Sequence, residues 1–264
     1  MKPFFISIPH SGERIPAETP WLHGLAEPLV MCDVDRYVDR LYQPVIDDLK
    51  LGLVKTQWHR YVVDLNRLPD DVDQESVIGS PNPPGKFTTG LHWIKTTKGE
   101  RLMPAPISQA LHNQLVERYF KPFHDDVKDM YGYFREKGHR AIYHLDAHSM
   151  PSKGTSAHKD PGETRAEIVV SDWEGRSCSV EYKELVCEAY KQAGLQVRVN
   201  WPYVGGRVTQ TYGKPDKGQH AIQVEINRML YMDEETKQLL PDKAQVLSKK
   251  LSSAVKYIFE NLPE

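Results

Sequence analysis

The chain has 264 residues, of which 39% are hydrophobic and 27% are charged. That length suits one globular domain with a large core, so we expect a single domain over residues 1–264. The 34 lysines and arginines against 36 aspartates and glutamates give a net charge of −2, without the basic excess that nucleic-acid-binding proteins usually show. No apolar run approaches the roughly 20 residues of a membrane span. We therefore expect neither a nucleic-acid nor a membrane partner.

The cysteines indicate the redox environment. Cys32, Cys178 and Cys187 are odd in number and show no C-x-x-C spacing. This pattern favours reduced thiols in a cytoplasmic protein over a disulfide framework or a zinc ribbon. The N-terminal segment also becomes polar too early to supply the apolar region of a signal peptide. The sequence does not indicate an oligomeric state.

The first elements along the chain are a strand, a helix and two further strands. An apolar run predicts a buried strand over residues 4–8, and i, i+3, i+4 spacing predicts an amphipathic helix with an acidic start over residues 35–50. Residues 51–58 and 61–65 have the composition of two strands. Residues 68–104 carry many prolines and glycines and predict a long loop, which in a compact domain is usually functional.

The middle of the chain continues the alternation of helix and strand. Helical periodicity extends over residues 107–134, with a kink or a new helix expected at Pro122. Residues 141–147 and 167–171 predict strands, and the polar residues 149–164 between them predict a loop.

The last part predicts a helix over residues 180–192, a strand over 195–199, a glycine-containing loop over 201–218, a strand over 221–226 and a closing helix over 243–261. Strands that alternate with helices indicate an α/β fold: a three-layer sandwich, with a mixed β-sheet covered by helices on both faces. In such sheets ligands bind at the carboxyl ends of the strands.

Two histidines follow predicted strands and are candidates for metal binding. His10 comes after the first strand, and His148 ends the strand that begins near residue 141. A catalytic metal commonly takes about three protein ligands, often two histidines and one carboxylate. Asp33 or Asp35, before the first helix, could supply the carboxylate. Alternatively, one of these aspartates caps that helix and each histidine is a satisfied core or surface residue.

Two other acidic residues lie near these histidines in the sequence. Asp146 shares one face of a strand with His148, so we expect it to fix the tautomer of an imidazole. Glu13 follows His10 with the H-x-x-E spacing of some zinc sites, although chance often produces this pattern and a solvated surface glutamate is as good an interpretation.

Glu225 lies within a predicted strand among apolar residues. A carboxylate in the middle of a sheet is costly unless it is paired or hydrogen-bonded. Glu225 is therefore a candidate general base that takes a proton from water. The alternative is a buried salt bridge with Arg228 or Arg67.

Two segments offer groups for binding an anionic substrate. Asn66 and Arg67 end a predicted strand, where the guanidinium could bind a substrate carboxylate or pair structurally with a nearby aspartate. Residues 205–213 offer backbone amides, the Thr209 hydroxyl and the Arg207 guanidinium, so this segment could bind a second anionic group or be an ordinary surface loop.

These residues lie in motifs that resemble one known family. Six blocks occur in the order seen in the N-formylglutamate amidohydrolase family: Pro9-His10-Ser11-Gly12, Asp33-Val34-Asp35-Arg36, Val62-Val63-Asp64-Leu65-Asn66-Arg67, Leu145-Asp146-Ala147-His148-Ser149-Met150, Gly205-Gly206 through Tyr212-Gly213, and His220 through Glu225 with Tyr231-Met232-Asp233-Glu234. The resemblance covers residues 4–235, and six ordered blocks are far more specific than one motif.

The resemblance implies a zinc-exopeptidase-like α/β fold and a metal-dependent hydrolase of a small N-acyl amino acid, with N-formyl-L-glutamate as the first expectation. It implies a divalent metal, zinc first, bound by His10, Asp35 and His148. It also implies Glu225 as the base and Arg67 as the anchor of the α-carboxylate.

The glycine loop departs from this family in two positions. Members that hydrolyse N-formylglutamate resemble G-G-H-x-T-R-x-Y-G here, whereas this chain has Arg207 in place of the histidine and Gln210 in place of the arginine. Arg207 is then the candidate for binding a side-chain carboxylate. The alternatives are an amidase of another N-acyl amino acid or of a peptidoglycan-type peptide, and a non-catalytic binding protein on the same fold.

Overall fold

A computed structural model describes residues 2–263. Six strands form one mixed sheet in the order β2-β1-β3-β6-β4-β5. The strands are β1 (Phe4–Ile8), β2 (Gly52–Lys55), β3 (Ile142–Met150), β4 (Ile168–Ser171), β5 (Val197–Val199) and β6 (Gln219–Asn227). β1, β2, β3 and β6 are parallel, whereas β4 is antiparallel to β6 and parallel to β5.

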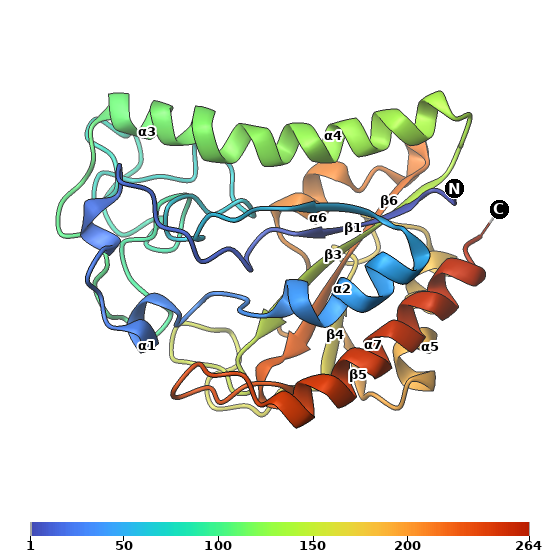
Figure 1. The fold of residues 1–264 in the computed structure, drawn as a ribbon. Coiled ribbons are helices and arrows are strands. Elements are labelled where there is room, and N and C mark those ends of the chain that lie inside the picture. The colour runs from blue at the N-terminus through green and yellow to red at the C-terminus, as the bar shows by residue number, and fades with distance from the viewer. Residues whose placement is uncertain (1, 264) are drawn as a thin grey trace.

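Helices cover both faces of this sheet, which confirms the expected sandwich (Figure 1). One face packs against α2 (Val38–Leu49), α5 (Val180–Gln192) and α7 (Pro241–Glu260). The other packs against α3 (Gln109–Leu115), α4 (Lys121–Glu136) and the short α6 (Arg207–Tyr212). A further short helix, α1 (Glu27–Val30), and 3-10 turns at Pro20–Leu22, Pro215–Lys217 and Arg228–Leu230 complete the structure.

The central strands have one apolar face and one face that becomes polar toward their carboxyl ends. In β3, Tyr143, Leu145 and Ala147 enter the core beneath α2, α5 and α7. Side chains alternate along a strand, so His144, Asp146 and His148 point to the opposite face. β1 and β6 flank β3, and the register places Glu225 beside His148. The polar side chains of the central strands therefore collect at one place on the sheet.

Several expected elements differ from the structure. Residues 61–65 form turns, because Val62 N bonds His59 O and Asp64 N bonds Leu91 O instead of a strand partner. The second strand is only Gly52–Lys55, and Arg207–Tyr212 forms a helix where a loop was predicted.

The helical segments also begin or break at specific residues. α2 begins at Val38 rather than at residue 35, since Tyr37 before it has a left-handed backbone (φ 70°) and no side chain caps the helix. The break expected near Pro122 is present as a π turn, Val116–Phe120, which places this proline in the first turn of α4, where its missing N–H is tolerated.

None of the helices described within residues 2–263 combines the length and apolarity needed to cross a bilayer. Cys32, Cys178 and Cys187 are all buried and free, as expected for reduced thiols.

Candidate functional site

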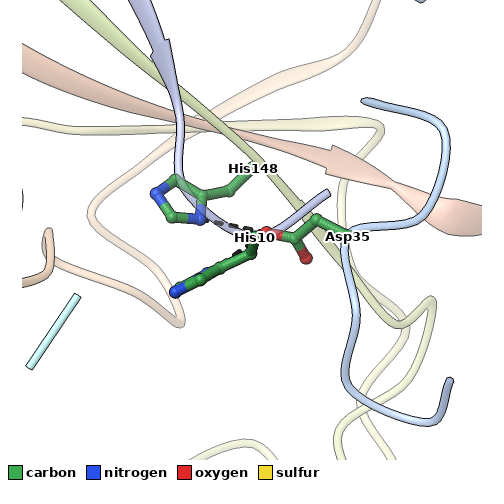
Figure 2. A group of neighbouring side chains, drawn as sticks. All are labelled: His10, Asp35 and His148. Atoms are coloured by element: carbon green, nitrogen blue, oxygen red, sulfur yellow. Dashed lines mark hydrogen bonds and ion pairs between the residues drawn. The ribbon is translucent and has the colours of Figure 1, made fainter. Parts of the chain in front are cut away.

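Three residues from separate segments meet at the carboxyl end of the parallel strands. His10 lies just after β1, and His148 lies in the adjacent strand β3. Asp35 lies in the turn before α2, where its backbone N–H donates to His10 O at 2.9 Å. One nitrogen or oxygen from each side chain lies within 4.8 Å of the others, and all three residues are buried (Figure 2).

The two imidazoles face one carboxylate oxygen. Asp35 Oδ2 lies 3.0 Å from His148 Nδ1 and 3.5 Å from His10 Nδ1. His10 Nδ1 is buried and has no hydrogen-bond partner among the described residues. Leaving a buried polar atom without a hydrogen-bond partner costs about 1–3 kcal/mol of folding free energy. This nitrogen is therefore available to bind a ligand or a metal ion. The donor set of two nitrogens and one oxygen could hold a metal ion.

The outer nitrogen of each imidazole is bound by an aspartate. His148 Nε2 lies 2.8 Å from Asp146 Oδ2, which is the role expected for Asp146, and His10 Nε2 lies 2.8 Å from Asp64 Oδ1. When Nε2 of each ring donates its N–H to one of these carboxylates, Nδ1 of that ring carries the free lone pair and faces Asp35. This role of Asp64 was not predicted, because its contact with His10 joins residues 54 positions apart in the chain.

Arg228 orients the other oxygen of Asp35. Its Nη2 donates to Asp35 Oδ1 at 3.0 Å, and Ser149 Oγ donates to the same oxygen at 3.1 Å. The guanidinium is buried and also donates to the carbonyl of Cys32. The sequence suggested Arg228 as a partner for Glu225, whereas the structure pairs Arg228 with Asp35.

The charges of the site shift two pKa values in opposite directions. Burial alone would raise the pKa of Asp35, but the His10 and His148 imidazoles beside its carboxylate hold that pKa well below its ordinary value. Burial alone would lower the pKa of His148, but the adjacent Asp146 carboxylate holds it well above its ordinary value. The surrounding carboxylates therefore favour a positive charge between them.

Glu225 is buried on β6 beside His148. Gln223 Nε2 donates to its Oε1 at 2.7 Å. Burial raises the pKa of Glu225. Within residues 2–263 Glu225 has no salt bridge to an arginine, so the structural alternative of an ion pair with Arg228 or Arg67 is not formed. A buried carboxylate with a raised pKa is suited to accept a proton in a reaction.

A cavity of about 380 Å³ opens onto these groups. Its lining includes His10, Asp35, His148 and Glu225, together with Asn66 and Arg67. Arg67 donates through Nε to Thr89 O at 2.8 Å and through Nη1 to Asn66 O at 3.0 Å. No carboxylate of the described chain pairs with Arg67, so its charge remains available to a ligand.

Asn66 reaches the cavity from a tightly packed position. Its Oδ1 accepts from Val208 N at 2.8 Å, and a Cβ at Gly206 would lie only 2.0 Å from Asn66 Nδ2. Gly206 N donates to Gln223 Oε1 at 2.7 Å. The amides of Gly206 and Val208 are thus used within the protein, and the glycine allows the close approach.

The two remaining residues expected to bind substrate, Arg207 and Thr209, are not among the residues that line the cavity. Both belong to α6, whose first turn directs the Arg207 guanidinium to Gln210 Oε1 at 3.0 Å and toward Asp71 Oδ2 at 3.5 Å. Thr209 is fully buried and does not line the cavity.

Two alternative carboxylates lie outside the cluster of histidines. Glu13 forms an ion pair with Arg36 at 2.9 Å and lines a separate cavity of about 750 Å³, which contains neither candidate histidine. Asp33 accepts hydrogen bonds from Tyr61 Oη at 2.6 Å and from Thr97. Of the three carboxylates that the sequence left open, the structure places Asp35 between the imidazoles.

Two imidazoles and one carboxylate beside a buried glutamate, at the carboxyl end of the parallel strands, form the kind of site that metal-dependent hydrolases use. Comparison with known proteins identifies the family of the chain. A sequence profile of the N-formylglutamate amidohydrolase family matches residues 2–232. The chain belongs to the N-formylglutamate amidohydrolase family.

Individual relatives agree with this assignment. The chain is 30% identical to the N-formylglutamate deformylase of Pseudomonas putida over 88% of its own length and 82% of that protein. The corresponding values for the N-formylglutamate deformylase of Pseudomonas aeruginosa are 30%, 88% and 83%. The crystal structure of N-formylglutamate amidohydrolase from Ralstonia eutropha superimposes with a TM-score of 0.84 at 26% identity, covering 97% of this chain and 92% of that one.

Proposed function

We propose that this protein is a metal-dependent amidohydrolase that converts N-formyl-L-glutamate to formate and L-glutamate. We propose zinc as the metal, with His10, Asp35 and His148 as its ligands. The observation that carries the proposal is the buried His10 Nδ1, which has no hydrogen-bond partner within residues 2–263 and faces the same Asp35 oxygen as His148 Nδ1. The names of the relatives support the substrate.

The chain's own residues divide the chemistry. A divalent metal, when bound, supplies a Lewis acid that polarises a carbonyl and lowers the pKa of water. Glu225 accepts the proton from the attacking water as the new C–O bond forms at the formyl carbon. Glu225 then returns this proton to the amide nitrogen as the C–N bond breaks, which releases formate and the free amine. Its burial and raised pKa support both the acceptance and the return of the proton.

Arg67 binds the α-carboxylate of the substrate in this proposal. Two of its nitrogens are fixed by the carbonyls of Thr89 and Asn66, which orients the guanidinium at the cavity without neutralising its charge. Asn66 lines the same part of the cavity. A positioned cation of this kind orients the bound substrate before the reaction, so less entropy is lost on reaching the transition state.

A related amidase activity is the second candidate function. It is favoured by one observation: Arg207, at which the glycine loop departs from the family pattern, does not line the cavity and contacts Gln210 and Asp71 instead. Another N-acyl amino acid or a peptidoglycan-type peptide would then be the substrate. A non-catalytic binding protein is disfavoured, because it would have no need for a buried unpartnered imidazole nitrogen beside a buried glutamate. The buried free thiols support a cytoplasmic location.

A panel of substrates tests this proposal. The protein is supplied with zinc, and the release of acid is measured from N-formyl-, N-acetyl- and N-succinyl-L-glutamate and from the N-formyl derivatives of glutamine and alanine. We expect the highest kcat/KM for N-formyl-L-glutamate. A clear preference for another acyl group or side chain would assign the second function, and no turnover of any member would favour the binding protein.

A further inference from the structure

The cations around the cavity differ in whether a carboxylate of the protein already pairs with them. Four lysine or arginine side chains line the cavity: Arg60, Arg67, Lys159 and Arg228. Arg228 pairs with Asp35 at 3.0 Å, and Arg60 pairs with Asp64 at 2.7 Å. Within residues 2–263, no carboxylate pairs with either of the other two.

N-formyl-L-glutamate carries two carboxylates, the same number as the cations unpaired within residues 2–263, Arg67 and Lys159. We propose that Lys159 recognises the side-chain carboxylate of the substrate, while Arg67 binds the α-carboxylate. This inference rests on the proposed function, and it assigns the side-chain specificity to Lys159, for which the sequence had suggested Arg207. A dianion entering a cavity loses hydration at both ends, so each carboxylate needs its own partner.

The loop that carries Lys159 is fixed on the C-terminal side of this lysine. Asp160 is buried and accepts two hydrogen bonds from Arg165, at 2.7 Å to Nε and 2.8 Å to Nη2. Arg165 Nη1 also donates to the hydroxyl of Tyr203, which itself lines the cavity. A Cβ on Gly154 would lie 2.0 Å from Asp160 O, so the two arms of the loop approach closely. The bidentate pair therefore sets the backbone position beside Lys159.

The loop is also fixed on the N-terminal side. His158 Nδ1 accepts from Thr155 N at 2.9 Å, and Thr155 Oγ1 donates to Thr97 O at 2.8 Å. Thr97, His158 and Lys159 all line the cavity. Lys159 thus stands between two anchored neighbours, and its side chain is exposed. An amine held in this way can follow a side-chain carboxylate without disturbing the buried site.

Kinetics on two matched substrates test this inference. Lys159→Gln removes the charge and keeps a polar side chain. We expect kcat/KM for N-formyl-L-glutamate to fall about tenfold, at the low end for a charge-assisted contact because the lysine is exposed. We expect kcat/KM for N-formyl-L-glutamine to change less than about threefold, since that substrate lacks the anion. Lys159→Arg should restore most of the lost preference.

Three control variants give this comparison its meaning. Lys153→Gln removes a charge from the same loop, at an exposed residue that does not line the cavity. This variant should leave kcat/KM unchanged for both substrates. Arg67→Gln should lower kcat/KM for both substrates alike. Arg207→Gln should leave the ratio between them unchanged. Equal losses for Lys159→Gln on both substrates, or no loss on either, would overturn the assignment.

A binding measurement separates failure of this inference from failure of the proposed function. In a Glu225→Gln background, calorimetry gives the affinity for N-formyl-L-glutamate and N-formyl-L-glutamine whether or not the protein hydrolyses them. A selective loss of affinity for the glutamate ligand on adding Lys159→Gln supports the role of Lys159 even if the wild-type protein shows no turnover. Equal affinities with and without Lys159, or binding of neither ligand, would overturn it.

Discussion

Replacing Arg228 with methionine should destabilise the protein and loosen the candidate metal site together. Arg228 is 3% exposed and pairs with Asp35, which is 1% exposed. Removing one partner of a buried ion pair leaves the other charge uncompensated, which costs about 3–5 kcal/mol. Asp35 would keep its hydrogen bonds from Ser149 and His148, so the lower end of this range is expected.

The assay is thermal unfolding of the metal-free protein. A loss of about 3 kcal/mol corresponds to a fall in Tm of roughly 6–12 °C for a chain of this size. Arg198→Met is the matched control, since its 2.7 Å pair with Glu163 lies on the surface, with the arginine side chain 48% exposed. That pair is expected to contribute at most about 1 kcal/mol.

Zinc titration of the same two variants tests the link to the metal site. Loss of a residue that orients a ligand typically weakens metal affinity by about 10- to 100-fold, and this loss is expected for Arg228→Met alone. If Arg228→Met unfolds at the same temperature as Arg198→Met and binds zinc as tightly as the wild-type protein, then Arg228 does not hold Asp35 for a metal.

Three further predictions follow from the site and its buried histidines. His148→Ala should remove bound metal and activity while circular dichroism shows a persisting fold, because Asp35 keeps Arg228 and Ser149 as partners; metal affinity at the wild-type level would contradict its role as a ligand. Glu225→Gln should keep the metal and lower kcat by roughly 10²- to 10⁴-fold, and a change below about threefold would exclude Glu225 as the base. Burial lowers the pKa of four histidines to about 4: His59, His92, His124 and His144. These side chains are neutral in the folded protein but gain protons below about pH 6.5 when it unfolds. Their contribution to stability is therefore present above pH 6.5 and is lost as the pH falls toward 4. Urea unfolding midpoints measured between pH 7.5 and pH 4.5 should decrease, and a constant midpoint would show that these histidines are not buried in neutral form.

The layers of the fold could be predicted because each element has a strong hydrophobic period. β1 and β3 are buried on both faces, and α2 and α7 show amphipathic spacing, so their places in the chain were evident. Residues 61–65 have the same β-branched composition as a strand, but their backbone groups bond to local turns and to Leu91. Such tertiary partners override local propensity.

The inner residues of the site could be predicted better than those that support them. His10 and His148 follow or end strands that became neighbours, so the rule that ligands collect at strand ends located them. Asp64 and Arg228 act through contacts between distant parts of the chain, to His10 and Asp35, and no local pattern distinguishes them from other charged residues. Arg207 begins a helix where a loop was predicted, and its guanidinium contacts Gln210 and Asp71 without lining the cavity.

The central claim, that His10, Asp35 and His148 hold a catalytic metal, is tested most directly by one titration. Protein stripped of metal by a chelator is titrated with zinc while formate release from N-formyl-L-glutamate is followed. The proposal predicts no activity without metal and a linear rise that saturates at about one zinc per chain. Full activity in the stripped protein, or saturation with zinc without any formate release, would contradict it.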